Sequence, residues 1–149
     1  MNKKGFTLVE LLAVIVILAV IILIAVNAVL PQMQKARKKS FADEGLSFAK
    51  AAENYYVDNQ LSGTQCVTVA NLKGQYVTKS DSDYVGKIIV NANDDGSITG
   101  KTIYLKNSKW KIVNVTADAL GADLEDKVVP AATATEASPA WTDAMASCE

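Results

Sequence analysis

The chain has 149 residues, enough for one ordinary domain, and half of them are hydrophobic. Its formal net charge of -1 provides no global basic field, so nucleic acid is not expected as a primary partner. It contains no histidine, and its two cysteines lack the spacing of a zinc site, so neither a metal nor another cofactor is expected.

The N-terminal part of the chain consists of two zones. Residues 1–5 form a short leader with two basic side chains, Lys3 and Lys4. Residues 6–30 are apolar and include sixteen consecutive apolar residues. As a helix, 25 residues extend about 37 Å, which is enough to cross a bilayer. One carboxylate, Glu10, lies just inside this run, where a lone charge in hydrocarbon is costly.

The third zone, residues 31–61, has the periodicity of an amphipathic helix. Six residues recur at the spacing of one helix face, namely Phe41, Gly45, Phe48, Ala49, Ala52 and Tyr56. Pro31 could kink one long rod rather than end it, and Ser62-Gly63 indicates where the helix stops.

The last zone, residues 62–149, contains three short runs rich in β-branched and aromatic residues: 86–92, 97–106 and 109–115. Short polar turns separate these runs, which predicts an antiparallel meander. A helix with one apolar face and three strands together predict an α+β fold, in which the long N-terminal helix packs on a small, about three-stranded sheet. Residues 65–84 have no clear pattern.

Beyond Val115 the chain is rich in Ala, Thr and Pro, and an irregular tail is expected there. If this zone lies outside the cytoplasm, one disulfide between Cys66 and Cys148 would tie the C-terminus to the middle of the chain. Trp110 and Tyr104 occupy alternating strand positions and are expected to pack in the core, with adhesive surface aromatics as the alternative.

The segment Asn91–Gly96 resembles the start of a calcium loop. Its first ligand position is Asn, and the twelfth position is Thr102 rather than a bidentate acid, so a hairpin turn is the better interpretation. No nucleophile–base pair, phosphate loop or acid pair appears in the sequence, so we do not expect an enzyme.

Three interpretations compete for the N-terminus. A secretory signal peptide would be cut after small residues, for which Val26-Asn27-Ala28 is passable. A plain signal anchor would remain uncut. Glu10 argues against both, because such segments are normally uncharged at this position. The third interpretation places the cut before the apolar run, between Gly5 and Phe6.

The stretch Lys-Lys-Gly-Phe-Thr-Leu-Val-Glu-Leu, residues 3–11, resembles the class III leader and processing site of type IV pilins and pseudopilins. The resemblance implies that a prepilin peptidase cuts after Gly5 and methylates the new N-terminal residue, Phe6. It also implies that Glu10 acts in assembly and that the apolar helices bundle as the core of a helical filament. Many family members have a glycine and a proline where this chain has Ala19 and Asn27, and the helix of related filaments can lose its structure between them. Because this chain lacks both residues there, we expect the helix to be weakest near Asn27–Pro31 instead.

Cleavage would create a free amine at Phe6, with a charge opposite to that of Glu10. Glu10 could pair with the amine of a neighbouring copy shifted along the axis, and a misaligned copy would leave a buried charge without its partner. One feature conflicts with the expected orientation. Four basic residues, Lys35, Arg37, Lys38 and Lys39, follow the apolar run, and the positive-inside rule would place them in the cytoplasm.

The expected function is that of a structural subunit of a bacterial type IV pilus, best matching a major pilin. Its expected partners are other copies of itself, prepilin peptidase, the pilus assembly machinery and, before assembly, the lipid bilayer. It would cross the cytoplasmic membrane once and later join a cell-surface pilus that serves adhesion, motility, aggregation or DNA uptake. The alternatives are a pseudopilin of a type II secretion or competence system, and a secreted soluble binding domain with a cleaved signal peptide.

Overall fold

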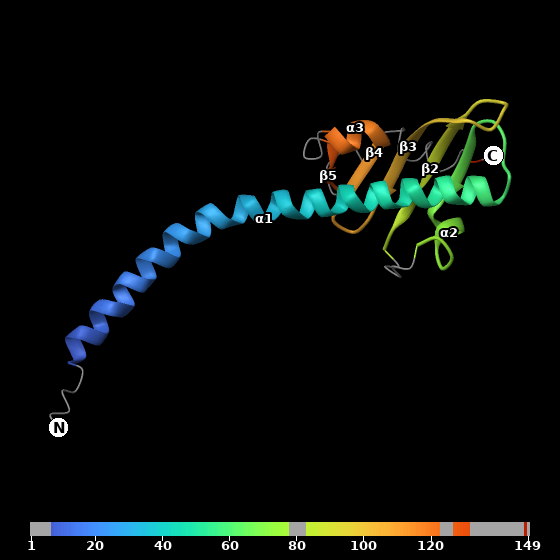
Figure 1. Cartoon of the computed structure of the whole chain (residues 1–149). Coiled ribbons are helices and arrows are strands. Elements are labelled where there is room, and N and C mark those ends of the chain that lie inside the picture. Colours follow the sequence, from blue (N-terminus) through green and yellow to red (C-terminus); the bar gives the residue numbers. More distant parts are fainter. Residues whose placement is uncertain (1–6, 78–82, 123–126, 132–147, 149) are drawn as a thin grey trace, which may run out of the picture. The chain divides into compact units, whose positions relative to one another are not determined.

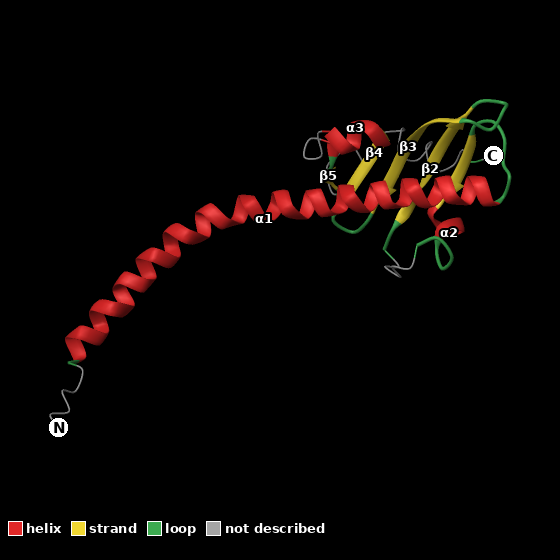
Figure 2. Ribbon diagram, in the orientation of Figure 1, coloured by secondary structure: helices red, strands yellow, loops and turns green. Residues whose placement is uncertain are grey.

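The structure is a computed structural model that describes residues 7–77, 83–122, 127–131 and 148 (Figure 1). Its elements are α1 (Leu8–Asp58), β1 (Gln65–Thr68), α2 (Val69–Leu72), β2 (Val85–Ala92), β3 (Ile98–Lys106), β4 (Trp110–Thr116), α3 (Ala117–Ala122) and β5 (Val129–Pro130) (Figure 2). The chain divides into two compact units, Met1–Arg37 and Lys38–Glu149. We call the second unit the head. The fold is α+β and type IV pilin-like, as predicted.

The first unit contains the apolar part of α1. Among the described residues, α1 is the one helix long and apolar enough to cross a membrane, and none of its most apolar window is buried within the chain. The helix continues through Pro31. Proline has no N–H to donate to the carbonyl four residues earlier, which belongs to Asn27. The side-chain amide of Asn27 in turn donates to the Leu23 carbonyl, at 3.1 Å.

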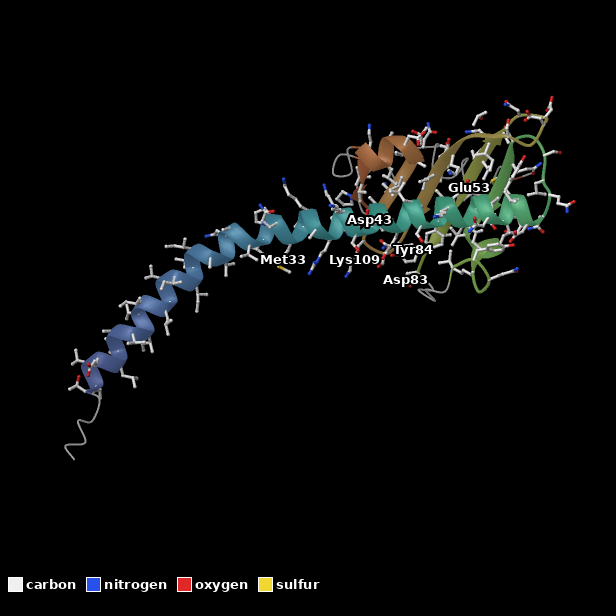
Figure 3. All side chains as sticks on the ribbon, in the orientation of Figure 1. Met33, Asp43, Glu53, Asp83, Tyr84 and Lys109 are labelled. Carbon is white, nitrogen blue, oxygen red and sulfur yellow. A yellow bond between two sulfur atoms is a disulfide. The ribbon has the colours of Figure 1, made fainter. Side chains whose placement is uncertain are left out.

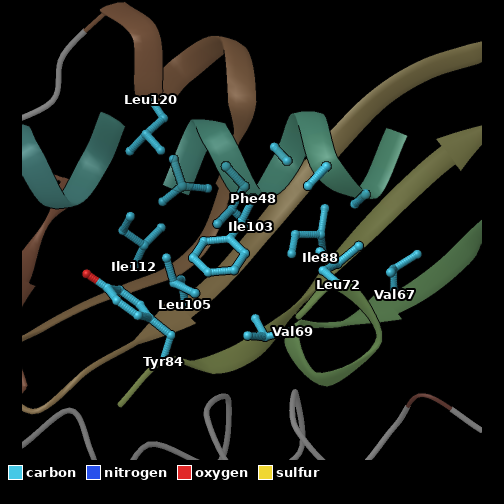
Figure 4. Packing of buried hydrophobic residues seen from close by; sticks show 14 of the residues in the cluster. Phe48, Val67, Val69, Leu72, Tyr84, Ile88, Ile103, Leu105, Ile112 and Leu120 are labelled. Atoms are coloured by element: carbon cyan, nitrogen blue, oxygen red, sulfur yellow. The ribbon is translucent and has the colours of Figure 1, made fainter. Parts of the chain in front are cut away.

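In the head, α1 packs its predicted apolar face against the sheet. All six residues of that face are buried, namely Phe41, Gly45, Phe48, Ala49, Ala52 and Tyr56. Figure 4 shows Phe48 among the strand residues Ile103 and Leu105. The approach is close at Gly45, where an added Cβ would lie 3.0 Å from Ile112 Cδ1. The periodicity in the sequence therefore identified the buried face correctly.

The sheet has five antiparallel strands in the order β1-β2-β3-β4-β5. Its three central strands confirm the predicted meander. The edge strands β1 and β5 were not predicted, since they have only four and two residues and no alternating pattern. The short helices α2 and α3 were not predicted either.

The two faces of the sheet have different surroundings. Ile88 and Ile103 pair across β2 and β3 and are fully buried in the core beside α1. Lys87 and Tyr104 form the next pair, so they point to the opposite face. There the Lys87 ammonium lies 5.6 Å from the centre of the Tyr104 ring, and burial lowers the pKa of Lys87.

The expectation that both aromatic strand residues pack in the core is correct for one of them. Trp110 is partly buried and packs against the core cluster. Tyr104 lies on the other face, and its hydroxyl donates to Asn114 Oδ1 at 2.9 Å. The β3–β4 register shifts between Ile103 and Leu105, and Asn114 on β4 has a φ of +53°. Asparagine tolerates this conformation. Tyr104 lies between Ile103 and Leu105, which are both buried in the core, so alternation along β3 places Tyr104 on the other face.

Helix α1 ends at Asp58, before the stop expected at Ser62-Gly63. Gln60 has a φ of +51° and donates its N–H to the Val57 carbonyl, while the Leu61 N–H donates to the Tyr56 carbonyl. These two bonds form a Schellman motif. This motif usually has glycine at the left-handed position. Because Gln60 occupies that position here, the sequence predicts the end of the helix at the next glycine, Gly63, which is too late.

The β2–β3 connection is a turn, in agreement with the preferred interpretation of Asn91–Gly96. The Gly96 N–H donates to the Asn93 carbonyl at 3.0 Å, and Gly96 has a φ of +82°. The Asp95 carboxylate accepts bonds from the side chain and backbone of Ser97, which lower its pKa. Within the described ranges, no three His, Cys, Asp or Glu side chains gather where they could hold a metal ion.

Candidate assembly site at the start of the long helix

The predicted site lies at the N-terminus of α1. Lys3, Lys4, Gly5 and Phe6 fall outside the described residues, so cleavage between Gly5 and Phe6 and methylation of Phe6 remain predictions. Glu10 is described. It is exposed and lies in the first turn of α1.

Glu10 has local partners within its own chain. The Thr7 hydroxyl and the Thr7 backbone N–H donate to Glu10 Oε2, at 3.3 and 3.4 Å. In return, the backbone N–H of Glu10 donates to Thr7 Oγ1 at 3.3 Å. This reciprocal arrangement is a capping box, which satisfies backbone donors that the first turn of a helix leaves without partners. It also places a carboxylate at the positive end of the helix dipole.

Thr7 is the site residue that our sequence reasoning missed. The signal was present, because Thr7-Leu8-Val9-Glu10 has the Ser/Thr-x-x-Glu spacing of a capping box before an apolar run. The box makes Glu10 less costly in the membrane than a bare carboxylate, since two donors and the helix dipole compensate part of its charge. The bonds are long and exposed, so the carboxylate can still receive a cation from another chain.

The helix that carries this site is apolar on every side. Large apolar side chains are exposed throughout it, from Leu8 at 83% through Leu23 at 69% to Val26 at 48%. A helix that is hydrophobic all round is stable only in a membrane or in the core of a larger structure. The described part of this chain contains nothing that covers these side chains, which is consistent with a membrane anchor.

The head carries a disulfide. The structure joins Cys66 to Cys148, with 5.5 Å between their Cα atoms and a sequence separation of 82. Cys66 pairs with Ile89 on β2, next to the core pair of Val67 and Ile88, so it points away from α1. Residue 148 is thereby fixed to the sheet face opposite the helix.

Comparison with protein families gives one match. Residues 1–26 match the model of the prokaryotic N-terminal methylation motif, which is the class III leader of type IV pilins and pseudopilins. The motif includes the predicted cleavage position and Glu10, and it ends at Val26 within the apolar run. The comparisons with curated proteins and with solved structures find no significant match. The leader motif therefore supports a type IV pilin-like, prepilin-processed protein, and the α+β fold is type IV pilin-like.

Proposed function

We propose that this type IV pilin-like chain is the structural subunit of a helical surface filament, most simply the major pilin of a type IV pilus. The observation that carries the proposal is an all-round apolar helix, exposed along its length, with one capped carboxylate at its start and a matching leader before it. Such a helix can exchange lipid for identical helices. We assign the chain no catalytic role.

Processing would prepare the subunit for assembly. Prepilin peptidase cuts after Gly5, and the methylated amine of Phe6 becomes the start of the apolar helix. That amine and Glu10 have opposite charges. In a neighbouring copy shifted along the axis, the amine can reach the Glu10 carboxylate, which its own capping box leaves accessible. In a low-dielectric core a paired charge is far less costly than a lone one.

The charge pair would select the register because the apolar surface cannot. Lipid tails are as apolar as Leu and Ile side chains, so moving a helix from bilayer to filament gains little hydrophobic energy. Side-chain packing favours assembly, and it changes gradually as helices slide past each other. The Glu10–amine contact is either made or lost, so it discriminates sharply between the correct alignment and all others.

The proposed location follows from the same features. Before assembly, the apolar helix would hold the subunit in the cytoplasmic membrane with the head outside. After processing, the assembly machinery would pass the subunit into the surface pilus. The Cys66–Cys148 bond suits this placement, because disulfides persist in oxidising compartments outside the cytoplasm.

Mass spectrometry of the mature N-terminus tests this function against its different-class alternative. A chain that begins with N-methylated Phe6 supports the proposal, and a chain that begins near Val29 would show a secreted domain released by signal peptidase. Electron microscopy of producing cells then addresses the same-family alternative. Long, abundant surface filaments labelled by antibody to the head support a major pilin, whereas their absence favours a pseudopilin.

A further inference from the structure

A basic side chain of α1 lies over an aromatic ring of β4 at one end of the head. On α1, the Lys38 ammonium lies 5.8 Å from the centre of the Trp110 ring, which is the first residue of β4. Lys109 precedes Trp110 and is exposed, as is Lys39 beside Lys38. Lys106 ends β3 on the other side of the same turn. In Figure 3, Lys109 lies toward the Asp43 end of the head, and Glu53 lies farther along α1.

This end is the one at which the chain leaves the apolar helix. Lys38 follows Leu30 by eight residues in one continuous helix, which corresponds to about 12 Å. The polar headgroup layer outside the hydrocarbon core is roughly 5–8 Å thick on each side. In a subunit whose apolar run fills the hydrocarbon core, Lys38 and Lys39 therefore start about 4–7 Å beyond the headgroup layer, a gap that the long lysine side chain can span.

We propose that this basic end, formed by Lys38, Lys39 and Lys109 around Trp110, docks on anionic phospholipid headgroups while the subunit is in the membrane. The inference rests on the membrane stage of the proposed function. It accounts for the basic residues that follow the apolar run in spite of the positive-inside rule, since their role is contact with the outer headgroups.

The composition of this end suits a lipid surface. Among the described residues of the head, Asp43 and Asp83 are exposed acids, and the Glu44 carboxylate is engaged by the Tyr84 hydroxyl. Trp and Lys are the residues that mark membrane interfaces, because each has an apolar body and a polar tip. Each lysine near an anionic surface strengthens binding about fivefold.

The test measures contact between Trp110 and headgroups in the full chain. Trp141→Phe leaves Trp110 as the sole tryptophan. The protein is reconstituted in phosphatidylcholine vesicles with or without phosphatidylglycerol, each containing a headgroup-labelled quencher lipid. We expect stronger quenching of Trp110 with phosphatidylglycerol, and loss of the difference at about 1 M salt, where charges are screened within about 3 Å.

Charge variants provide the control. Lys39→Glu with Lys109→Glu should abolish the phosphatidylglycerol-dependent quenching. Lys50→Glu with Lys73→Glu changes the net charge equally, at exposed lysines outside the basic end, and should retain it. Equal quenching in both lipids, or equal loss in both variants, overturns the inference. Binding of duplex DNA by the chain, with no difference in Trp110 quenching between the two lipid compositions, also overturns the inference. Failure of the chain to float with vesicles would instead reject the membrane stage of the proposed function, and the inference with it.

Discussion

Replacing Glu10 with Gln should block filament assembly while leaving the membrane helix intact. Gln has nearly the size of Glu and keeps one side-chain oxygen that can accept hydrogen bonds. In the wild type, the Thr7 hydroxyl and the Thr7 N–H donate to Glu10 Oε2 at 3.3 and 3.4 Å, and the Gln oxygen can take the place of Oε2. Gln is also an accepted partner in a capping box, so the start of α1 should survive. The change therefore removes the charge and little else.

The magnitude follows from the charge that remains. In a filament of Glu10→Gln subunits, each Phe6 amine would be buried without a carboxylate. Removing one partner of a buried ion pair costs about 3–5 kcal/mol, which corresponds to roughly two to four powers of ten in the equilibrium constant for adding a subunit. Membrane insertion should be as efficient as in the wild type or better, because a neutral side chain replaces a charge in the apolar helix.

The assay compares filaments sheared from cells with subunits left in the membrane, using an antibody to the head. Thr7→Val is the matched control, since it removes the capping hydroxyl and leaves the carboxylate. Loss of an N-cap costs about 1 kcal/mol, so its effect on yield should be near fivefold. Wild-type filament yield in Glu10→Gln would refute the charge-pair reasoning, and so would a larger defect in Thr7→Val than in Glu10→Gln.

Three further predictions concern the head. Reducing the Cys66–Cys148 bond should lower the free energy of unfolding by about 4 kcal/mol, because it releases a long loop. Chemical denaturation with and without reductant measures this change. The control is the double variant Cys66→Ser, Cys148→Ser, whose stability should not respond to reductant. Gly45→Val should destabilise the head by about 1–3 kcal/mol or more, because its Cβ alone would lie 3.0 Å from Ile112 Cδ1 and 3.2 Å from Leu120 Cδ2. Ser47→Ala on the exposed side of α1 is the control and should be nearly neutral. An unchanged melting temperature for Gly45→Val would contradict the packing described for Gly45. The Tyr76 phenol should titrate above the ordinary tyrosine pKa, because desolvation and then the hydrogen bond to Asp58 at 2.9 Å favour its protonated form. Its contribution to stability should be complete below the unfolded pKa of about 10 and disappear as the pH rises through the folded pKa. The difference in tyrosinate absorbance between wild type and Tyr76→Phe, followed with pH, gives the midpoint of the Tyr76 titration. Asp58→Asn should lower this midpoint. A midpoint at or below the ordinary tyrosine pKa would disprove the assignment.

Much of this architecture was predictable because it depends on residues close together in sequence. The all-apolar run and the single Glu10 within it require only a count along the chain. The buried face of α1 follows from the 3.6-residue period, so Phe41, Phe48 and Tyr56 could be assigned to the core. The three central strands are similarly marked by β-branched runs and by polar turns with Asn, Asp and Gly. The Thr7–Glu10 box is equally local, and its spacing alone could have revealed it.

Tertiary structure decided the features that depend on pairing between distant segments. Two-residue β5 exists only because β4 offers it hydrogen-bond partners, and Cys66 meets Cys148 across 82 residues. The hydrogen bond from Tyr104 to Asn114 joins β3 to β4 beside a register shift between these strands, which alternation within one strand cannot show. Lys38 and Trp110 come together because α1 crosses the sheet at that end of β4. Sequence period fixes which side of an element is apolar, whereas strand register and helix crossing fix which distant residues become neighbours.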